Sequence, residues 1–208
     1  MQRAQRWVMW LSAYSGARAG EITQLRGVDI ERHGALFAMK LTPEAGSIKT
    51  HEARTVPLHE HLIEQGFIEF IESIGKGPLF YEPRAAGVVD DPTNPRLAPA
   101  VKMRGKLGVW VRSLGVSDRG VGPTHGWRHT FLRIARQAGI DETVRFAITG
   151  HKLPSTGHSY ATPSTEEMAE ALKKFPRYEV ETAPAASKGE MAGARKGAVK
   201  KRKRKAIA

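Results

Sequence analysis

The sequence predicts an α+β domain that is mostly helical and carries a small antiparallel β-sheet. Apolar side chains recur at helical spacing over residues 7–14, which predicts a first helix ending near Gly16. Two later segments, ALFAMKL (35–41) and IKTHEARTVPL (48–58), have the pattern of strands and are joined by the turn-rich TPEAGS. Helical patterns dominate elsewhere, so one small sheet among many helices is the expected class.

The remaining helices follow in order. A second helix should begin near Arg18, and another should contain Leu62 and break at Gly75. The Pro-, Asp- and Gly-rich stretch 82–99 indicates a loop, so Asp90 and Asp91 are interpreted as turn residues. Further helices are expected around residues 101–114, 130–138, 141–148 and 164–175.

Composition narrows the class of protein. The chain of 208 residues has no cysteine, which excludes disulfides, a cysteine nucleophile and thiolate metal sites. It has no apolar run of membrane-spanning length and no secretory signal pattern, so we expect a cytoplasmic protein without membrane contact.

The positive charge is concentrated at the C-terminal end. The net charge is +12, and from Lys188 onward nine Lys or Arg face one Glu, a net +8. We therefore expect a folded domain over residues 1–178 and a basic, disordered tail over 179–208 that binds a polyanion, nucleic acid first. The densest run of this tail comprises Lys200, Lys201, Arg202, Lys203, Arg204 and Lys205.

Several short patterns could carry chemistry. In SGARAGE, Arg18 begins a helix and Glu21 lies one turn on, which fits an ordinary helix-start pair or an arginine held to face a phosphate. In THGWRHTF, His125 and Arg128 are three residues apart at a helix start, where both could address one ligand. Taken singly, each pattern is equally consistent with residues that have only a structural role.

Two more patterns are equally ambiguous alone. Lys49 lies at the turn-proximal end of an extended segment, where lysines are usually just solvated. In GHKLPSTGHSYAT, His151 precedes Tyr160 by nine residues, and most tyrosines simply pack their ring and hydrogen-bond their hydroxyl.

Together, the stretches SGARAGEITQLRGVDI, IKTHEARTVPL, THGWRHTF and GHKLPSTGHSYAT resemble, in order and approximate spacing, the catalytic domain of the tyrosine recombinases, the phage-integrase family. The resemblance covers residues 7–175. It implies a bacterial or phage-encoded enzyme that cleaves and rejoins duplex DNA at specific sites. It also implies roles for seven residues: Arg18 and Arg128 as catalytic arginines, Lys49 as the hairpin lysine, His125 and His151 as active-site histidines, Tyr160 as nucleophile and Glu21 as supporting acid.

These residue types suit the implied chemistry. Two arginines and a histidine can stabilise the charge that develops on a phosphodiester's non-bridging oxygens. A tyrosine with a pKa near 10 is only about 0.3% ionised at pH 7.5, so neighbouring guanidiniums and a base such as His125 would assist it. Lys49 could protonate the departing 5′ oxygen. The product would be a 3′-phosphotyrosine, and neither a metal, a cofactor nor ATP is expected.

Three alternatives remain open. A type IB topoisomerase shares this chemistry, a non-catalytic integrase remnant would only bind DNA, and a chromatin-type protein would explain the tail alone. Tyr178 is the second candidate nucleophile, ahead of Tyr14 and Tyr81. Members of the family usually carry an N-terminal core-binding domain and act as multimers on paired DNA sites. Only about seven residues precede the first expected helix here, so we expect either a catalytic-domain fragment or a short protein that depends on a partner or on its basic tail for affinity.

Overall fold

The computed structural model describes residues 1–43, 52–83, 85, 98–151 and 162–179. The chain divides after Arg177, and Met1–Arg177 forms a compact unit that contains all of the described helices and strands. These elements are α1 Gln2–Ser15, α2 Ala19–Ile22, the 3₁₀ turn η1 Gly27–Asp29, β1 Ile30–His33, β2 Leu36–Leu41, β3 Arg54–Pro57, α3 Glu60–Glu64, α4 Phe67–Ile74, α5 Pro99–Ser113, α6 Gly126–Gln137, α7 Glu142–Thr149 and α8 Thr165–Leu172. Helices with a three-stranded antiparallel sheet confirm the predicted fold class.

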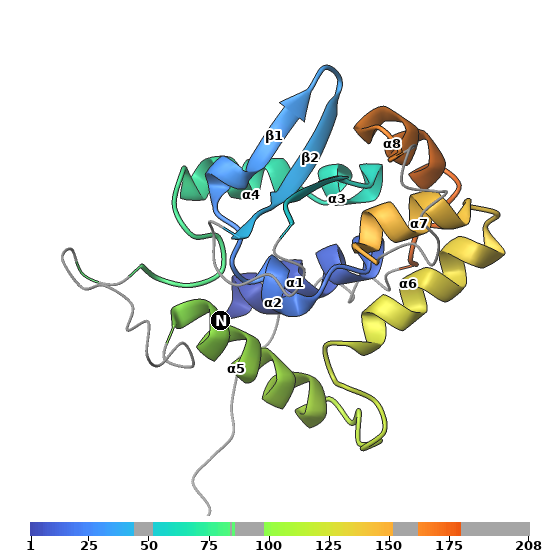
Figure 1. Ribbon diagram of the computed structural model, residues 1–208. Helices are drawn as coiled ribbons and strands as arrows, with labels where there is room; N and C mark the ends of the chain where they lie inside the picture. Colours follow the sequence, from blue (N-terminus) through green and yellow to red (C-terminus); the bar gives the residue numbers. More distant parts are fainter. Residues whose placement is uncertain (44–51, 84, 86–97, 152–161, 180–208) are drawn as a thin grey trace, which may run out of the picture. The chain divides into compact units, whose positions relative to one another are not determined.

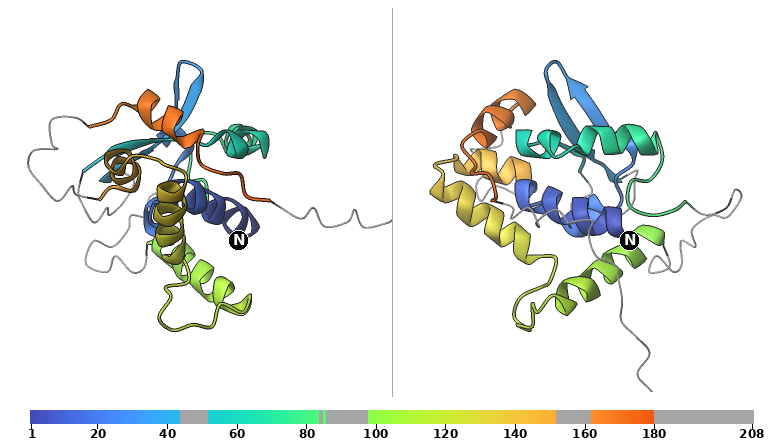
Figure 2. Two further views of the ribbon diagram at one scale, coloured as in Figure 1. Left: turned by 90° about the vertical axis from the view of Figure 1, so that its right-hand side faces the viewer. Right: turned by 180° about the vertical axis from the view of Figure 1, so that it is seen from behind.

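Helix α1 is the central element of the compact unit (Figure 1). It packs against α2, α5 and α6, and its apolar face is fully buried, with Val8 and Leu11 at 0% exposure. Trp7 packs on Phe67 of α4 with ring centroids 4.9 Å apart. Both views of Figure 2 place the sheet and α5 on opposite sides of α1. The predicted end of this helix is also confirmed, because Gly16 terminates it in the left-handed conformation.

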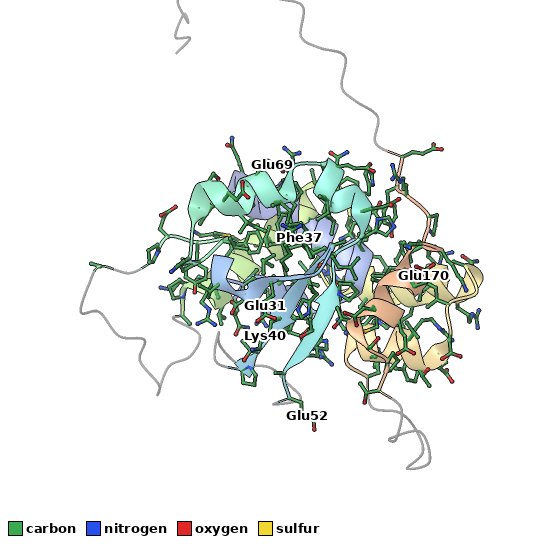
Figure 3. All side chains as sticks on the ribbon, turned by 90° about the horizontal axis from the view of Figure 1, so that it is seen from above. Glu31, Phe37, Lys40, Glu52, Glu69 and Glu170 are labelled. Carbon is green, nitrogen blue, oxygen red and sulfur yellow. The ribbon has the colours of Figure 1, made fainter. Side chains whose placement is uncertain are left out.

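The sheet has the strand order β1-β2-β3. Met39 pairs with Val56 and Leu41 with Arg54, so these four side chains share a face. Met39, Leu41 and Val56 are buried. On the opposite face of the sheet, the Nζ of Lys40 lies 3.8 Å from the Oε1 of Glu31, and the two side chains are 46% and 38% exposed. Figure 3 shows these two side chains near each other. Strand β1 was not predicted from the sequence, because its residues alternate without a clear apolar face.

The chain segment after α8 is anchored in the core. The ring of Phe175, 2% exposed, stacks on Phe131 of α6 with centroids 5.1 Å apart. The Phe175 carbonyl lies 3.2 Å from the Nε2 of the buried His59. Helix α8 itself packs on β2, β3 and α7.

The structure refines three expected elements. Helix α2 is a single turn. Further along the chain, the backbone of Gly27 approaches Gly75 so closely that a Cβ there would lie 1.8 Å from the Gly75 oxygen. The helix expected around Leu62 is two helices, since Gly66 has a φ of 85° between them. Helix α6 begins at Gly126, earlier than expected.

Among the residues that the structure describes, no helix is long and apolar enough to cross a membrane. The assignment of residues 1–178 and 179–208 to a catalytic domain and a DNA-binding tail stays a prediction, because residues 180–208 lie outside the described part.

Gly16 and Gly34 allow a matched test of packing at the end of α1. Both have a φ near +60°, but a Cβ on Gly16 would lie 2.8 Å from Phe131 and 2.9 Å from Thr149, whereas a Cβ on Gly34 meets nothing within 4 Å. Gly34→Ala should lower the free energy of unfolding by about 1 kcal/mol, because a residue with a Cβ is strained in the left-handed backbone conformation. Gly16→Ala should cost about 2–4 kcal/mol, because overpacking adds to that strain. Urea unfolding measures both, and equal losses would contradict this packing.

Candidate active site

Glu21 of α2 is the centre of the predicted site. Its side chain is 3% exposed, and its carboxylate accepts four hydrogen bonds. The backbone N–H and the Nη1 of Arg18 donate over 3.0 and 2.9 Å. The Nη2 and Nη1 of Arg54 donate over 2.7 and 3.4 Å. Burial alone would raise the pKa of Glu21, but the bonds and charge of Arg54, followed by the bonds from Arg18, lower it. The carboxylate therefore stays ionised at neutral pH.

Arg54 was not singled out from the sequence. It begins β3, its side chain is 12% exposed, and its Nε donates to the carbonyl of Ile148 over 3.3 Å. It lies within the stretch IKTHEARTVPL, on the strand face shared with Val56. An arginine on the buried face of a strand needs a buried partner, but the pattern of this short strand does not show that Arg54 lies on that face.

Arg128 of α6 is 3% exposed, and its Nη1 joins two chain segments. It donates to the carbonyl of Gly16 over 2.9 Å and to that of Thr149 over 2.5 Å. Its Nη2 is buried and has no hydrogen-bond partner among the described residues. Burial lowers the pKa of Arg128 to about 10, helped by the charges of Arg18 and Arg54 and opposed by Glu21. The guanidinium is thus charged at neutral pH.

The site has an excess of positive charge. Arg18 and Arg54 bind the single carboxylate of Glu21, and Arg128 interacts with all three through its charge. Three guanidiniums and one carboxylate leave two positive charges uncompensated within this group. Arg18 remains 26% exposed while it holds Glu21. A buried donor without a partner and a net positive charge together favour an anion. In the part of the chain that is described, no group of three His, Asp or Glu side chains could hold a metal ion.

His151 follows α7 directly, and Thr149 orients it. The Thr149 Oγ1 donates to the Arg145 carbonyl over 2.7 Å and lies 2.8 Å from the Nδ1 of His151. Because a hydroxyl has one hydrogen, the His151 Nδ1–H must donate to Oγ1 in the neutral ring, which leaves Nε2 as an acceptor. Burial, then the charges of Arg128, Arg18, Arg54 and His129, lower the pKa of His151 to about 4.

His125 lies at the start of α6 and is exposed, unlike the buried Arg128 one turn further on. Its ring meets that of His129 edge to face, with centroids 5.0 Å apart. His129, against which His125 packs, is itself close enough to the site to contribute to the low pKa of His151. Sequence reasoning did not single out His129 or Thr149.

One basic side chain of α5 lies beside the site. Arg104 is exposed, and a Cβ on Gly20 of α2 would lie 3.2 Å from its Nη1. Arg104 therefore lies against the helix that Arg18 precedes.

The structure brings four of the predicted residues together, namely Arg18, Glu21, Arg128 and His151. It does not test Lys49, Tyr160 or the tail residues Lys200, Lys201, Arg202, Lys203, Arg204 and Lys205, which lie outside the described residues.

Comparison with known proteins yields a fold but no family. Neither models of known families nor curated protein sequences match this chain. Among solved structures, the chain is similar to an integrase from mycobacterium phage Brujita, with 19% identity and a TM-score of 0.55. The similarity covers 86% of this chain and 55% of that one, so the chain spans little more than half of the integrase. The compact unit thus shares its fold with part of a phage integrase.

The titration of His151 tests the charge balance of the site. Its ring should protonate with a midpoint of about 4 rather than 6.5, measured by NMR of the ring C–H signals. Because the unfolded chain then binds this proton more tightly, the contribution of His151 to stability is complete above pH 6.5 and declines as the pH falls toward 4. A midpoint at or above 6.5 would remove the argument for uncompensated positive charge.

Proposed function

We propose that this chain is the catalytic domain of a site-specific DNA recombinase, which cleaves and rejoins strands through a covalent phosphotyrosine. One observation carries the proposal: Arg18 and Arg54 share the single carboxylate of Glu21, and the guanidinium of Arg128, which feels all three charges, has a buried Nη2 without a partner among the described residues. The fold shared with a phage integrase supports it.

A phosphodiester is the anion that fits this charge best. Its phosphate carries one negative charge, and the transition state of phosphoryl transfer gathers further charge on the non-bridging oxygens. Two uncompensated positive charges match that developing charge better than they match the ground state, which is the condition for catalysis. Arg18 and Arg128 would donate to the non-bridging oxygens, as fork-shaped donors suit phosphate.

The reaction balances without a cofactor. The Tyr160 oxygen would attack phosphorus and lose its proton to a nearby base, for which His125 is the candidate. The bond from phosphorus to the 5′ oxygen would break, and Lys49 would supply a proton to that oxygen. The strand would then be held as a 3′-phosphotyrosine, and a 5′ hydroxyl could reverse the step and join strands.

His151 would join the site once phosphate binds. A bound anion offsets the charges of Arg128, Arg18 and Arg54, which are among the causes of the low pKa of His151. Its pKa therefore rises, and a protonated Nε2 can donate to a phosphate oxygen while Nδ1 remains bonded to Thr149.

Double-stranded DNA is the proposed partner. Exposed Arg104 on α5, which lies against α2, would extend the contact to a neighbouring phosphate, and the basic tail would add salt-dependent affinity. Recombination joins two DNA sites, so we propose that several copies act together.

Covalent trapping tests this function. A nicked duplex from the protein's own genomic neighbourhood is incubated with the protein in EDTA and analysed on a denaturing gel. The wild-type protein should give a shifted protein–DNA band, and Tyr160→Phe should give none, because it lacks the attacking oxygen.

The other outcomes separate the alternatives. A band that survives Tyr160→Phe would transfer the role to another residue, Tyr178 first. Salt-sensitive DNA binding without any band would favour a non-catalytic binding protein. Relaxation of supercoils by a monomer would favour a type IB topoisomerase.

Glu21→Gln tests the role of the central carboxylate, and Asp29→Asn is its matched control. Asp29 is 3% exposed and repeats the geometry of Glu21, since it accepts from the backbone N–H of Arg26 and from its guanidinium. Glu21→Gln should lose about 3–5 kcal/mol of stability, because it leaves the buried Arg54 uncompensated, and Asp29→Asn should lose less, because Arg26 is 33% exposed. Only Glu21→Gln should also slow covalent trapping, by at least about tenfold.

Rates are compared under conditions where both variants are fully folded by circular dichroism. Equal rates for the two variants would show that Glu21 serves the fold alone.

A further inference from the structure

Arg54 lies where three parts of the site meet. Its guanidinium binds both carboxylate oxygens of Glu21 and donates through Nε to the Ile148 carbonyl near the end of α7. It thereby connects β3 with α2, which begins after Arg18, and with the segment that leads into His151. Each of the three guanidinium nitrogens of Arg54 already donates to Glu21 or Ile148, whereas the Nη2 of Arg128 has no partner among the described residues.

The end of α7 is shaped around this guanidinium. Gly150 has a φ of +68°, and a Cβ there would lie 2.9 Å from both the Cζ and the Nη1 of Arg54. Any side chain at position 150 would therefore displace Arg54 or the end of α7. The next residue is His151, whose placement depends on the same backbone.

Arg54 also determines how fully the carboxylate of Glu21 neutralises Arg18. Of the four donors to this carboxylate, two come from Arg54 and two from Arg18. Without Arg54, the Oε2 of Glu21 would keep only the backbone N–H of Arg18, and the carboxylate would neutralise Arg18 more fully. Arg54 thus leaves the charge of Arg18 available for a second anion.

We propose that Arg54 is a positioning residue of the phosphate site, which holds Glu21 and the end of α7 so that Arg18, Arg128 and His151 face one phosphate. The catalytic part of this inference rests on the proposed function. Its structural part, that Arg54 is needed for anion binding, concerns the free protein without DNA. Arg54 acts through these neighbours and does not touch the reacting atoms.

Three variants separate the positioning role from a general structural one. Arg54→Gln removes the charge and the fork, and Arg54→Lys keeps the charge but cannot bridge Glu21 and Ile148. Arg26→Gln is the control, since Arg26 holds Asp29 in a comparable buried pair outside the site. Covalent trapping should fall about tenfold to a hundredfold in Arg54→Gln, less in Arg54→Lys, and not in Arg26→Gln at full folding.

A readout without DNA is the titration of His151 by NMR. Loss of the Arg54 charge should raise the pKa of His151 in Arg54→Gln, whereas Arg54→Lys and Arg26→Gln should leave it low. The groups that face His151 are Arg18, Arg128 and His129 besides Arg54, and all remain in these variants. Inorganic phosphate should shift the His151 signals in wild type with higher affinity than in Arg54→Gln.

Gly150→Ala provides a second route in case Arg54→Gln does not fold. It displaces the guanidinium but keeps the charge, and Gly34→Ala is its control because it has the same backbone strain in open space. Trapping should fall about tenfold in Gly150→Ala and stay unchanged in Gly34→Ala.

The outcomes distinguish this inference from the proposed function. If Arg54→Gln matches wild type in trapping, phosphate affinity and His151 titration, the inference is overturned while the function stands. If wild type forms no covalent complex but phosphate affinity and the His151 pKa respond to Arg54→Gln as expected, the function fails and the positioning role stands.

Discussion

The ionised carboxylate of Glu21 is the constraint on which the site depends. A buried carboxylate is stable only if donors replace its lost hydration, and here four N–H groups from Arg18 and Arg54 do so. One carboxylate cannot neutralise three guanidiniums, so Arg128 has no counter-ion of its own among the described residues. The same ion pair that links α2 to β3 therefore leaves room in the charge balance for an external anion.

The sequence could identify the local pairs but not which of them forms a site. The pattern of an arginine followed three residues later by an acid occurs twice, as Arg18–Glu21 and as Arg26–Asp29, and both fold into the same buried arrangement. What distinguishes the first pair is Arg54, 33 positions away from Glu21, which reaches it through the fold. Spacing along the chain carries no information about such a partner.

The helices and the sheet class were predictable because apolar periodicity reports directly which face of an element is buried. The need for glycine at positions 16 and 150 was not predictable, because in each case a side chain from a distant element occupies the space that a Cβ would fill. Arg54 escaped prediction for a similar reason: in a strand of only four residues, alternation does not reveal that a charged side chain lies on the buried face.

The site is assembled from long-range contacts, since Arg128 reaches the Gly16 carbonyl across 112 positions and Arg54 reaches Ile148 across 94. No fragment or partly folded chain can contain it. Any anion that binds there binds the native state alone, and by mass action it adds to the free energy of unfolding. A phosphate group bound there would accordingly act on this chain as a ligand that selects its fully folded form.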